Sequence, residues 1–206
     1  MLVARAERSR PITRGRPTWE IVQFFPKQGE WTEDDFFALE DNRRLELSDG
    51  CLEILPMPTE PHQAIMLFLY SALQAFVSAR KLGKVMIAGL PLRLWVGKLR
   101  EPDILFLKAE RFSLRSEQCW NGADLVMEIV SKHNRPHDIR TKRLEYAKAG
   151  IPEYWIIDPQ KSHIVILKLN GRRRYTEQGV FGRGEQASSV LLRGFSVEVS
   201  EVLDAE

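Results

Sequence analysis

The sequence is poor in cysteine and has no long uninterrupted hydrophobic run. Its two cysteines, Cys51 and Cys119, stand far apart and show no C-x-x-C spacing, which argues against a disulfide framework or a cysteine-based zinc site. No apolar run approaches the about 20 residues needed to cross a bilayer, and the N-terminus lacks the hydrophobic segment of a secretory signal. We therefore expect a soluble, cytoplasmic protein with no membrane partner.

Net charge is also small, at +2, but the basic residues are clustered. Arginines crowd the first sixteen positions, and residues 1–18 are predicted to form a flexible basic arm ahead of a single domain at 19–206. A second cluster comprises Arg93, Lys98 and Arg100. Such clusters attract phosphate groups, although each one taken alone is equally typical of a solvated surface.

The predicted elements alternate between helices and strands. A capping box at Thr32–Asp35 starts a short helix through Glu40, and the apolar periodicity of 61–82 predicts the longest helix. A hairpin is expected from 43–47 and 51–55, and strands at 84–88, 90–96 and 102–107 are expected to form a small antiparallel meander. The remaining predicted elements are a strand at 124–131, a helix at 138–149, a strand at 153–158 and a hairpin beginning at 163–169.

Two carboxylates interrupt apolar strands. Glu128 lies within Leu125–Val130, and Asp103 begins the run Pro102–Leu107. An unpaired buried charge is costly, so each must face solvent, have a partner or bind a cation. A solvent-facing Glu128 and a simple Pro-Asp turn at Asp103 are the alternatives. On neighbouring strands, however, the pair would supply the hard oxygen ligands that Mg²⁺ prefers.

The helix after the second carboxylate carries a cation. Asp138, Lys142 and Tyr146 are spaced by four residues and share one helix face. Lys142 could neutralise charge on a metal-bound phosphate while Asp138 holds its ammonium group. An ordinary solvated ion pair explains the same spacing. His133 and His137 have the spacing of a helical metal pair, but the intervening Pro136 indicates a loop and disfavours zinc.

Together these segments resemble the Uma2 family of restriction-endonuclease-like proteins, within the PD-(D/E)XK nuclease superfamily. The match runs from about Thr32 to the C-terminal strands. Its motifs are Arg44–Gly50, His62-Gln63, Glu101–Phe106, Glu128–Ser131, the spacing from Asp138 through Lys142 to Tyr146, and Ala149–Pro159. The resemblance implies a single α/β domain with a restriction-endonuclease-like mixed sheet flanked by helices.

The resemblance also implies residue roles. Asp103 and Glu128 would be metal ligands, with the backbone carbonyl of Ile129 as a third. Glu46 matches the upstream acidic position, where it would bind a second metal or hold a water, unless it is a hairpin glutamate facing solvent. His62 matches a family position without a defined role, and a hydrogen bond at the helix N-terminus would also explain it.

The sequence departs from the superfamily pattern at one position. Val130 stands two residues after Glu128, where a lysine is normal. The Uma2 resemblance points to Lys142 as the replacement, and Lys132 is the rival because it lies nearer in sequence.

The resulting hypothesis is a Mg²⁺-dependent endonuclease, with Mn²⁺ as a substitute ion, that hydrolyses phosphodiester bonds in DNA. Asp103, Glu128, Lys142 and Glu46 would form the catalytic set, and Arg93, Lys98 and Arg100 would grip the DNA backbone. The alternative is a nuclease-fold protein that binds DNA or a partner without cleavage. Homodimerisation would suit an enzyme that cuts both strands, but no residue specifies it.

Overall fold

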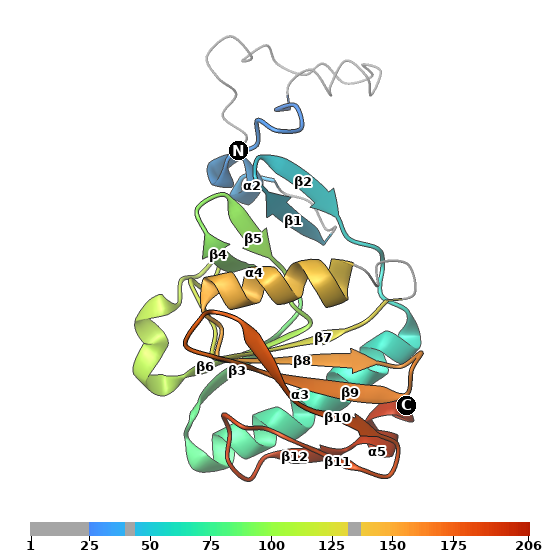
Figure 1. Cartoon of the computed structure of the whole chain (residues 1–206). Coiled ribbons are helices and arrows are strands. Elements are labelled where there is room, and N and C mark those ends of the chain that lie inside the picture. The colour runs from blue at the N-terminus through green and yellow to red at the C-terminus, as the bar shows by residue number, and fades with distance from the viewer. Residues whose placement is uncertain (1–24, 40–43, 132–136) are drawn as a thin grey trace.

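The computed structural model describes residues 25–39, 44–131 and 137–206 (Figure 1). The predicted basic arm at 1–18 therefore lies outside the described residues, as do Glu40, Lys132, His133 and Pro136.

A mixed six-stranded sheet forms the centre of the molecule, in the order β10-β9-β8-β7-β6-β3. Only β7 and β8 pair in parallel, and a helix connects them, as a parallel crossover requires. The strands are β3 (Gly83–Ile87), β6 (Ile104–Lys108), β7 (Leu125–Ile129), β8 (Glu153–Asp158), β9 (His163–Leu169) and β10 (Tyr175–Gly182).

Helices cover both faces of this sheet, as Figure 1 shows. On one face, α3 (Glu60–Arg80) and the short α5 (Val199–Leu203) pack against side chains that include Met127 and Ile129. On the other, α4 (Lys142–Ala149) packs against Val126 and Val130. Because neighbouring positions of a strand face opposite sides, the apolar run of β7 fills both cores. The architecture confirms the expected α/β fold with a mixed sheet between helices.

The α3 helix bears on the expectation that no segment is long and apolar enough to cross a membrane. Within the described residues it is the one helix long and apolar enough, by length and composition alone, to cross a membrane. Its buried residues recur every four positions, Ile65, Leu69, Leu73 and Val77, and contact the sheet. That amphipathic packing is typical of a core helix, whose apolar composition is explained by the sheet it covers.

A smaller four-stranded sheet, in the order β2-β1-β5-β4, lies beyond α4 (Figure 1). Its strands are β1 (Leu45–Ser48), β2 (Cys51–Ile54), β4 (Leu92–Trp95) and β5 (Lys98–Arg100). The β1–β2 hairpin and the Thr32–Asp35 capping box are confirmed, with α2 running over Glu33–Phe37. Phe36 of α2 packs with Leu47 and Leu99 of the smaller sheet to form a small separate core.

The predicted meander at 84–107 is wrong. β3 pairs directly with β6 in the large sheet, whereas the β4–β5 hairpin between them joins β1 in the small sheet. β6 is buried along most of its length and therefore belongs in a sheet that is covered on both faces. The predicted helix at 138–149 also differs, because a π-helical turn at His137–Thr141 precedes α4.

The C-terminal segment is tied to β8 by a buried carboxylate. Glu153, 1% exposed, accepts hydrogen bonds from Trp155 Nε1, Ser189 Oγ and the backbone N–H groups of Val190 and Leu191, at 2.6–2.8 Å. These bonds hold the loop that leads from β11 (Gln186–Ser188) to β12 (Ser196–Glu198). A six-residue 3₁₀ segment, Ala109–Leu114, follows β6.

Candidate active site

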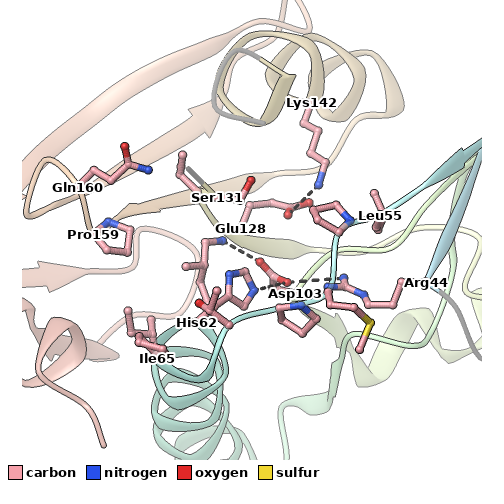
Figure 2. A pocket seen from close by; sticks show the side chains of 17 residues that line it. Arg44, Leu55, His62, Ile65, Asp103, Glu128, Ser131, Lys142, Pro159 and Gln160 are labelled. Atoms are coloured by element: carbon pink, nitrogen blue, oxygen red, sulfur yellow. Dashed lines mark hydrogen bonds and ion pairs between the residues drawn. The ribbon is translucent and has the colours of Figure 1, made fainter. Parts of the chain in front are cut away.

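Asp103 directly precedes β6, and Glu128 lies in β7, the antiparallel neighbour of β6 in the large sheet. Ile104 is paired with Met127, so continuing the register by one residue places Asp103 opposite Glu128. Both residues are only 3% exposed, and both line one pocket of about 470 Å³ (Figure 2). The burial of Glu128 contradicts the solvent-facing alternative considered for it, whereas Asp103 lies in a bend directly before β6.

Asp103 is held from three sides. Its Oδ2 accepts a hydrogen bond from the backbone N–H of Ile129 at 2.9 Å, and its Oδ1 lies 3.0 Å from His62 Nε2 and 3.6 Å from an Arg44 guanidinium nitrogen. Burial alone would raise the pKa of Asp103, but the hydrogen bond and charge of His62 and the charge of Lys142 lower it below its ordinary value. Asp103 is therefore an anion at neutral pH.

His62 is the reciprocal partner in that contact. Burial would lower the pKa of its imidazole, but the hydrogen bond to Asp103 and the charge of Asp103 raise it above the ordinary value. His62 lies in the first turn of α3, so the family position that had no defined role from sequence is a direct contact of Asp103.

Glu128 is held by two residues of α4. The Tyr146 hydroxyl donates to Oε1 at 2.5 Å. Lys142 Nζ lies 2.9 Å from Oε2, as Figure 2 shows. Burial, reinforced by the charge of Glu128, raises the pKa of Tyr146 well above its ordinary value, so the phenol stays a neutral donor. The helix face predicted from the spacing of Lys142 and Tyr146 therefore contacts Glu128. The side chain of Asp138, the third residue predicted for that face, lies outside the described set.

The structure also explains why Val130 can replace the usual lysine. Val130 is on the same face of the chain as Glu128 and is buried with Tyr146 and Ala147 beneath α4. Lys142 reaches Glu128 from the helix that covers that face, and it is itself 5% exposed. The rival Lys132 lies outside the described residues.

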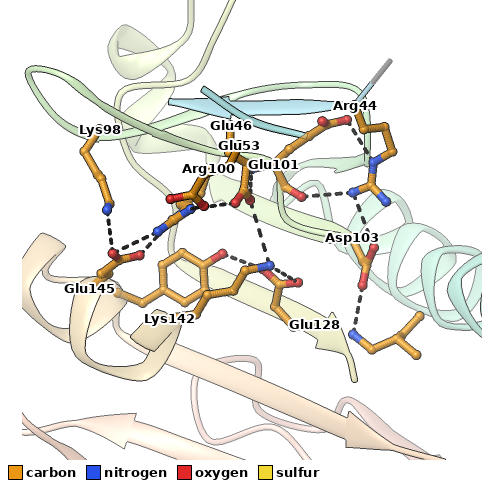
Figure 3. Close-up of polar contacts among 12 residues, drawn as sticks. Arg44, Glu46, Glu53, Lys98, Arg100, Glu101, Asp103, Glu128, Lys142 and Glu145 are labelled. Carbon is orange, nitrogen blue, oxygen red and sulfur yellow. Dashed lines mark hydrogen bonds and ion pairs between the residues drawn. The ribbon is translucent and has the colours of Figure 1, made fainter. Parts of the chain in front are cut away.

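Glu46 approaches the same lysine from the small sheet. Its Oε1 lies 3.9 Å from Lys142 Nζ and accepts the backbone N–H of Glu101 at 3.0 Å, and its Oε2 lies 2.6 Å from Arg100 (Figure 3). Burial would raise the pKa of Glu46, but Lys142 and Arg100 lower it below its ordinary value. Glu46 is completely buried, so the alternative of a solvent-facing hairpin glutamate is contradicted.

The expectation that Lys98 and Arg100 grip a DNA backbone is wrong. Arg100 is 1% exposed and contacts Glu46, Glu53 and Glu145 at 2.6–3.0 Å. Lys98 is 4% exposed and lies 2.7 Å from Glu145. Both cations are therefore enclosed and neutralised within the protein, and they join the small sheet to α4 (Figure 3).

Arg93 contacts other parts of the protein, and its expected contact with DNA stays a prediction. Its guanidinium forms an ion pair with Glu33 at 2.6 Å and donates to Asn121 at 2.8 Å. It does not line the pocket that contains Asp103 and Glu128. The ion pair with Glu33 connects the start of α2 to β4.

Two site residues had no role assigned from sequence. Arg44 lines the pocket beside Asp103, and its guanidinium also lies 3.2 Å from Glu101. Glu145 lies one turn beyond Lys142 on α4, where Arg100 and Lys98 hold it. Arg44 is part of the Arg44–Gly50 motif, so position alone could have drawn attention to it. The Glu145 contact joins residues 45 positions apart in sequence and left no local signal.

The donor set fits Mg²⁺. Within the described residues no group of three or more His, Cys, Asp and Glu side chains is placed to hold a metal. Mg²⁺ commonly uses only one or two protein carboxylates and completes its octahedron with waters and substrate oxygens. Asp103 and Glu128 offer two such carboxylates in a shared pocket.

Comparison with solved structures shows that the fold of this chain is shared with a protein of known structure. A "putative nuclease belonging to DUF820" from Anabaena variabilis is similar over 84% of this chain and 97% of its own, with a TM-score of 0.70 and 19% identity. The type IIG restriction endonuclease BpuSI is matched over 67% of this chain and 15% of its own, with a TM-score of 0.36 and 15% identity.

A match to a family model establishes the family of the chain. Residues 33–200 match the model of the Uma2 family, described as "Putative restriction endonuclease". The chain belongs to this family, as its motifs indicated, and the description of the family supports a nuclease. The curated proteins contain no match to the chain.

Proposed function

We propose that the protein is a Mg²⁺-dependent endonuclease that hydrolyses phosphodiester bonds in DNA. The observation that carries the proposal is the meeting of Asp103, Glu128 and Lys142 in one pocket, because two hard carboxylates beside an ammonium group suit a metal-bound phosphate. The family's description and the nuclease fold favour the same reaction. Mn²⁺ is the expected substitute ion.

The chain's own residues have distinct tasks in this proposal. Asp103 and Glu128 would hold the ion, with the carbonyl of Ile129 as a third ligand, and the bound ion would lower the pKa of a water and polarise the phosphate. Asp103 is fixed for this by the Ile129 N–H and His62, and Glu128 by Tyr146. Such contacts orient ligands before substrate arrives.

Lys142 would offset the negative charge that develops on the phosphate. Water oxygen forms a bond to phosphorus, the ester P–O bond breaks, and the leaving oxygen takes up a proton. Arg44, which lines the pocket on the Asp103 side, supplies a second cation for the phosphate. Glu46 lies behind Lys142 and has no place among the pocket-lining residues, so we assign it to positioning the lysine.

The test is Mg²⁺-dependent nicking of supercoiled plasmid by the purified protein, with Asp103→Asn as the matched variant. Asparagine keeps the size of the side chain but removes the charge that the ion needs. We expect cleavage by the native protein in Mg²⁺ or Mn²⁺, none in a chelator, and none by Asp103→Asn. Equal cleavage by both proteins would assign the activity to a contaminant.

One observation favours a second candidate function, binding of DNA without cleavage. Lys142 already forms an ion pair with Glu128 at 2.9 Å, which uses an oxygen that the ion would share. Calorimetric titration with Mn²⁺ distinguishes the two candidates. A binding heat that is lost in Glu128→Ala supports the enzyme, whereas DNA binding with no response to metal supports the binder.

A further inference from the structure

The pocket has two chemically different ends. Its charged end contains Asp103, Glu128, Lys142, His62 and Arg44. Much of the remaining lining is apolar, and we define an apolar wall as Leu55, Pro56, Met57, Pro58, Ile65 and Pro159; the polar side chains of Thr59, Ser131 and Gln160 also line the pocket. Figure 2 labels Leu55, Ile65 and Pro159 of this wall. The wall comes from the segment that follows β2, from α3 and from the turn after β8, so three separate parts of the chain build it.

The apolar wall does not suit the backbone of duplex DNA. Surfaces that hold a phosphate backbone are polar and strongly basic, because they replace counterions. None of the six wall residues is charged or carries a side-chain hydrogen-bond donor. A surface of this kind gains free energy by covering an apolar face, such as that of a nucleobase.

The depth of the carboxylates limits how DNA can reach them. Asp103 and Glu128 are each 3% exposed, so the scissile phosphate must enter the pocket rather than rest on its rim. The pocket volume of about 470 Å³ is that of a site for one small-molecule-sized group. A base-paired duplex, which is wider than its major groove of about 12 Å, does not fit in a pocket of this volume. A single nucleotide that has left the base stack is small enough to enter the pocket.

We propose that the apolar wall receives the base of an unpaired nucleotide whose phosphate lies between Asp103 and Lys142, so the enzyme acts preferentially on unpaired DNA. This inference rests on the proposed function. Proline at three wall positions makes the surface rigid, and Met57, 82% exposed, supplies a flexible and polarisable side chain that adapts to any base. The preference is therefore for strand state and not for sequence.

The experiment uses three fluorescent oligonucleotide substrates of one sequence: a single strand, a perfect duplex and a duplex with an unpaired bulge. With the full-length protein in Mg²⁺, we expect cleavage of the single strand and at the bulge to be at least about tenfold faster than cleavage of the duplex, because extruding a paired base costs free energy that an unpaired base does not. Equal rates on all three substrates would overturn the inference and leave the proposed function intact.

A pair of variants tests the wall itself. Met57→Ala should reduce the preference for unpaired DNA, whereas Val96→Ala, a second highly exposed apolar residue that does not line the pocket, should leave it unchanged. If the native protein cleaves none of the three substrates, the proposed function fails. The inference is then decided by fluorescence anisotropy in a chelator: weaker single-strand binding by Met57→Ala alone supports it, and equal affinity of the native protein for all three DNAs overturns it.

Discussion

Replacing Arg100 with methionine should destabilise the protein by about 3–5 kcal/mol at neutral pH, the usual cost of removing one partner from a buried ion pair. Arg100 is 1% exposed and contacts three carboxylates. Methionine fills much of the same space without a cation. Because domains of this size are stable by only about 5–15 kcal/mol, the loss would be a large fraction of the total.

The magnitude follows from what the variant leaves behind. Glu46 is fully buried and would keep only Lys142 at 3.9 Å and the Glu101 N–H as partners. Glu145 would keep Lys98 at 2.7 Å, and Glu53, which is 37% exposed, could turn to solvent. Most of the cost therefore falls on Glu46, and an effect near the lower end of the range is expected if Lys142 moves closer to it.

The assay is urea unfolding of the native protein and of Arg100→Met at neutral pH and at about pH 5. In the native protein the pKa values of Glu46 and Glu145 are lowered, so their contribution to stability is complete above their ordinary pKa values and is lost as pH falls below them. Without Arg100 the pKa of Glu46 should rise, so at about pH 5 Glu46 becomes protonated and the variant no longer carries its uncompensated buried charge. The difference in unfolding free energy should therefore narrow at the lower pH.

The control is Arg183→Met, which removes a bidentate ion pair with Asp204 that is exposed to solvent. It should change stability far less and show no comparable narrowing. A loss below about 1 kcal/mol for Arg100→Met, or a loss that is the same at both pH values, would refute the reasoning.

Three further substitutions test the site and its support. Lys142→Met should lower the cleavage rate by about 10²–10³-fold while Mn²⁺ binding by calorimetry persists, and Lys142→Arg should recover part of the rate; unchanged cleavage would remove Lys142 from the mechanism. Tyr146→Phe deletes the hydrogen bond to Glu128 and should weaken Mn²⁺ binding by about tenfold, whereas an unaltered affinity would show that the hydroxyl does not orient the ligand. Glu153→Gln should cost about 1–3 kcal/mol in urea unfolding and increase proteolysis at the loop 189–192, because an amide nitrogen cannot accept the bonds that the carboxylate accepts; unchanged stability and proteolysis would contradict this.

Local patterns in the sequence were sufficient for much of the fold. The periodicity of 61–82 located α3 to within two residues at each end, and the Ser48–Gly50 turn located the β1–β2 hairpin. The division of the strands between two sheets was not predictable in the same way. β3 pairs with β6, although the β4–β5 hairpin that lies between them in sequence belongs to the smaller sheet. Pairing between strands so separated is decided by burial in the folded molecule.

The candidate site shows the same division. Glu128 stood out because a charge in an apolar strand requires a partner, and the spacing of Lys142 and Tyr146 correctly placed both on the helix face that contacts it. The predicted contact of Lys98 and Arg100 with DNA was wrong because it was based on their charge, and the charge of a residue does not indicate whether its side chain is exposed or buried. Arg44 and Glu145 were missed because their partners are distant in sequence.

The placement of the site lysine on α4 has a consequence for assembly of the enzyme. A lysine at position 130 would arrive with the strand itself, whereas Lys142 depends on a helix that Arg100 fastens, through Glu145, to the smaller sheet. Lys142 therefore has partners from both sheets, Glu128 from the central sheet at 2.9 Å and Glu46 from the smaller sheet at 3.9 Å. The proposed site is therefore complete only when the two sheets are docked, and a substitution in the smaller sheet should be able to shift Lys142 without altering any residue of the pocket.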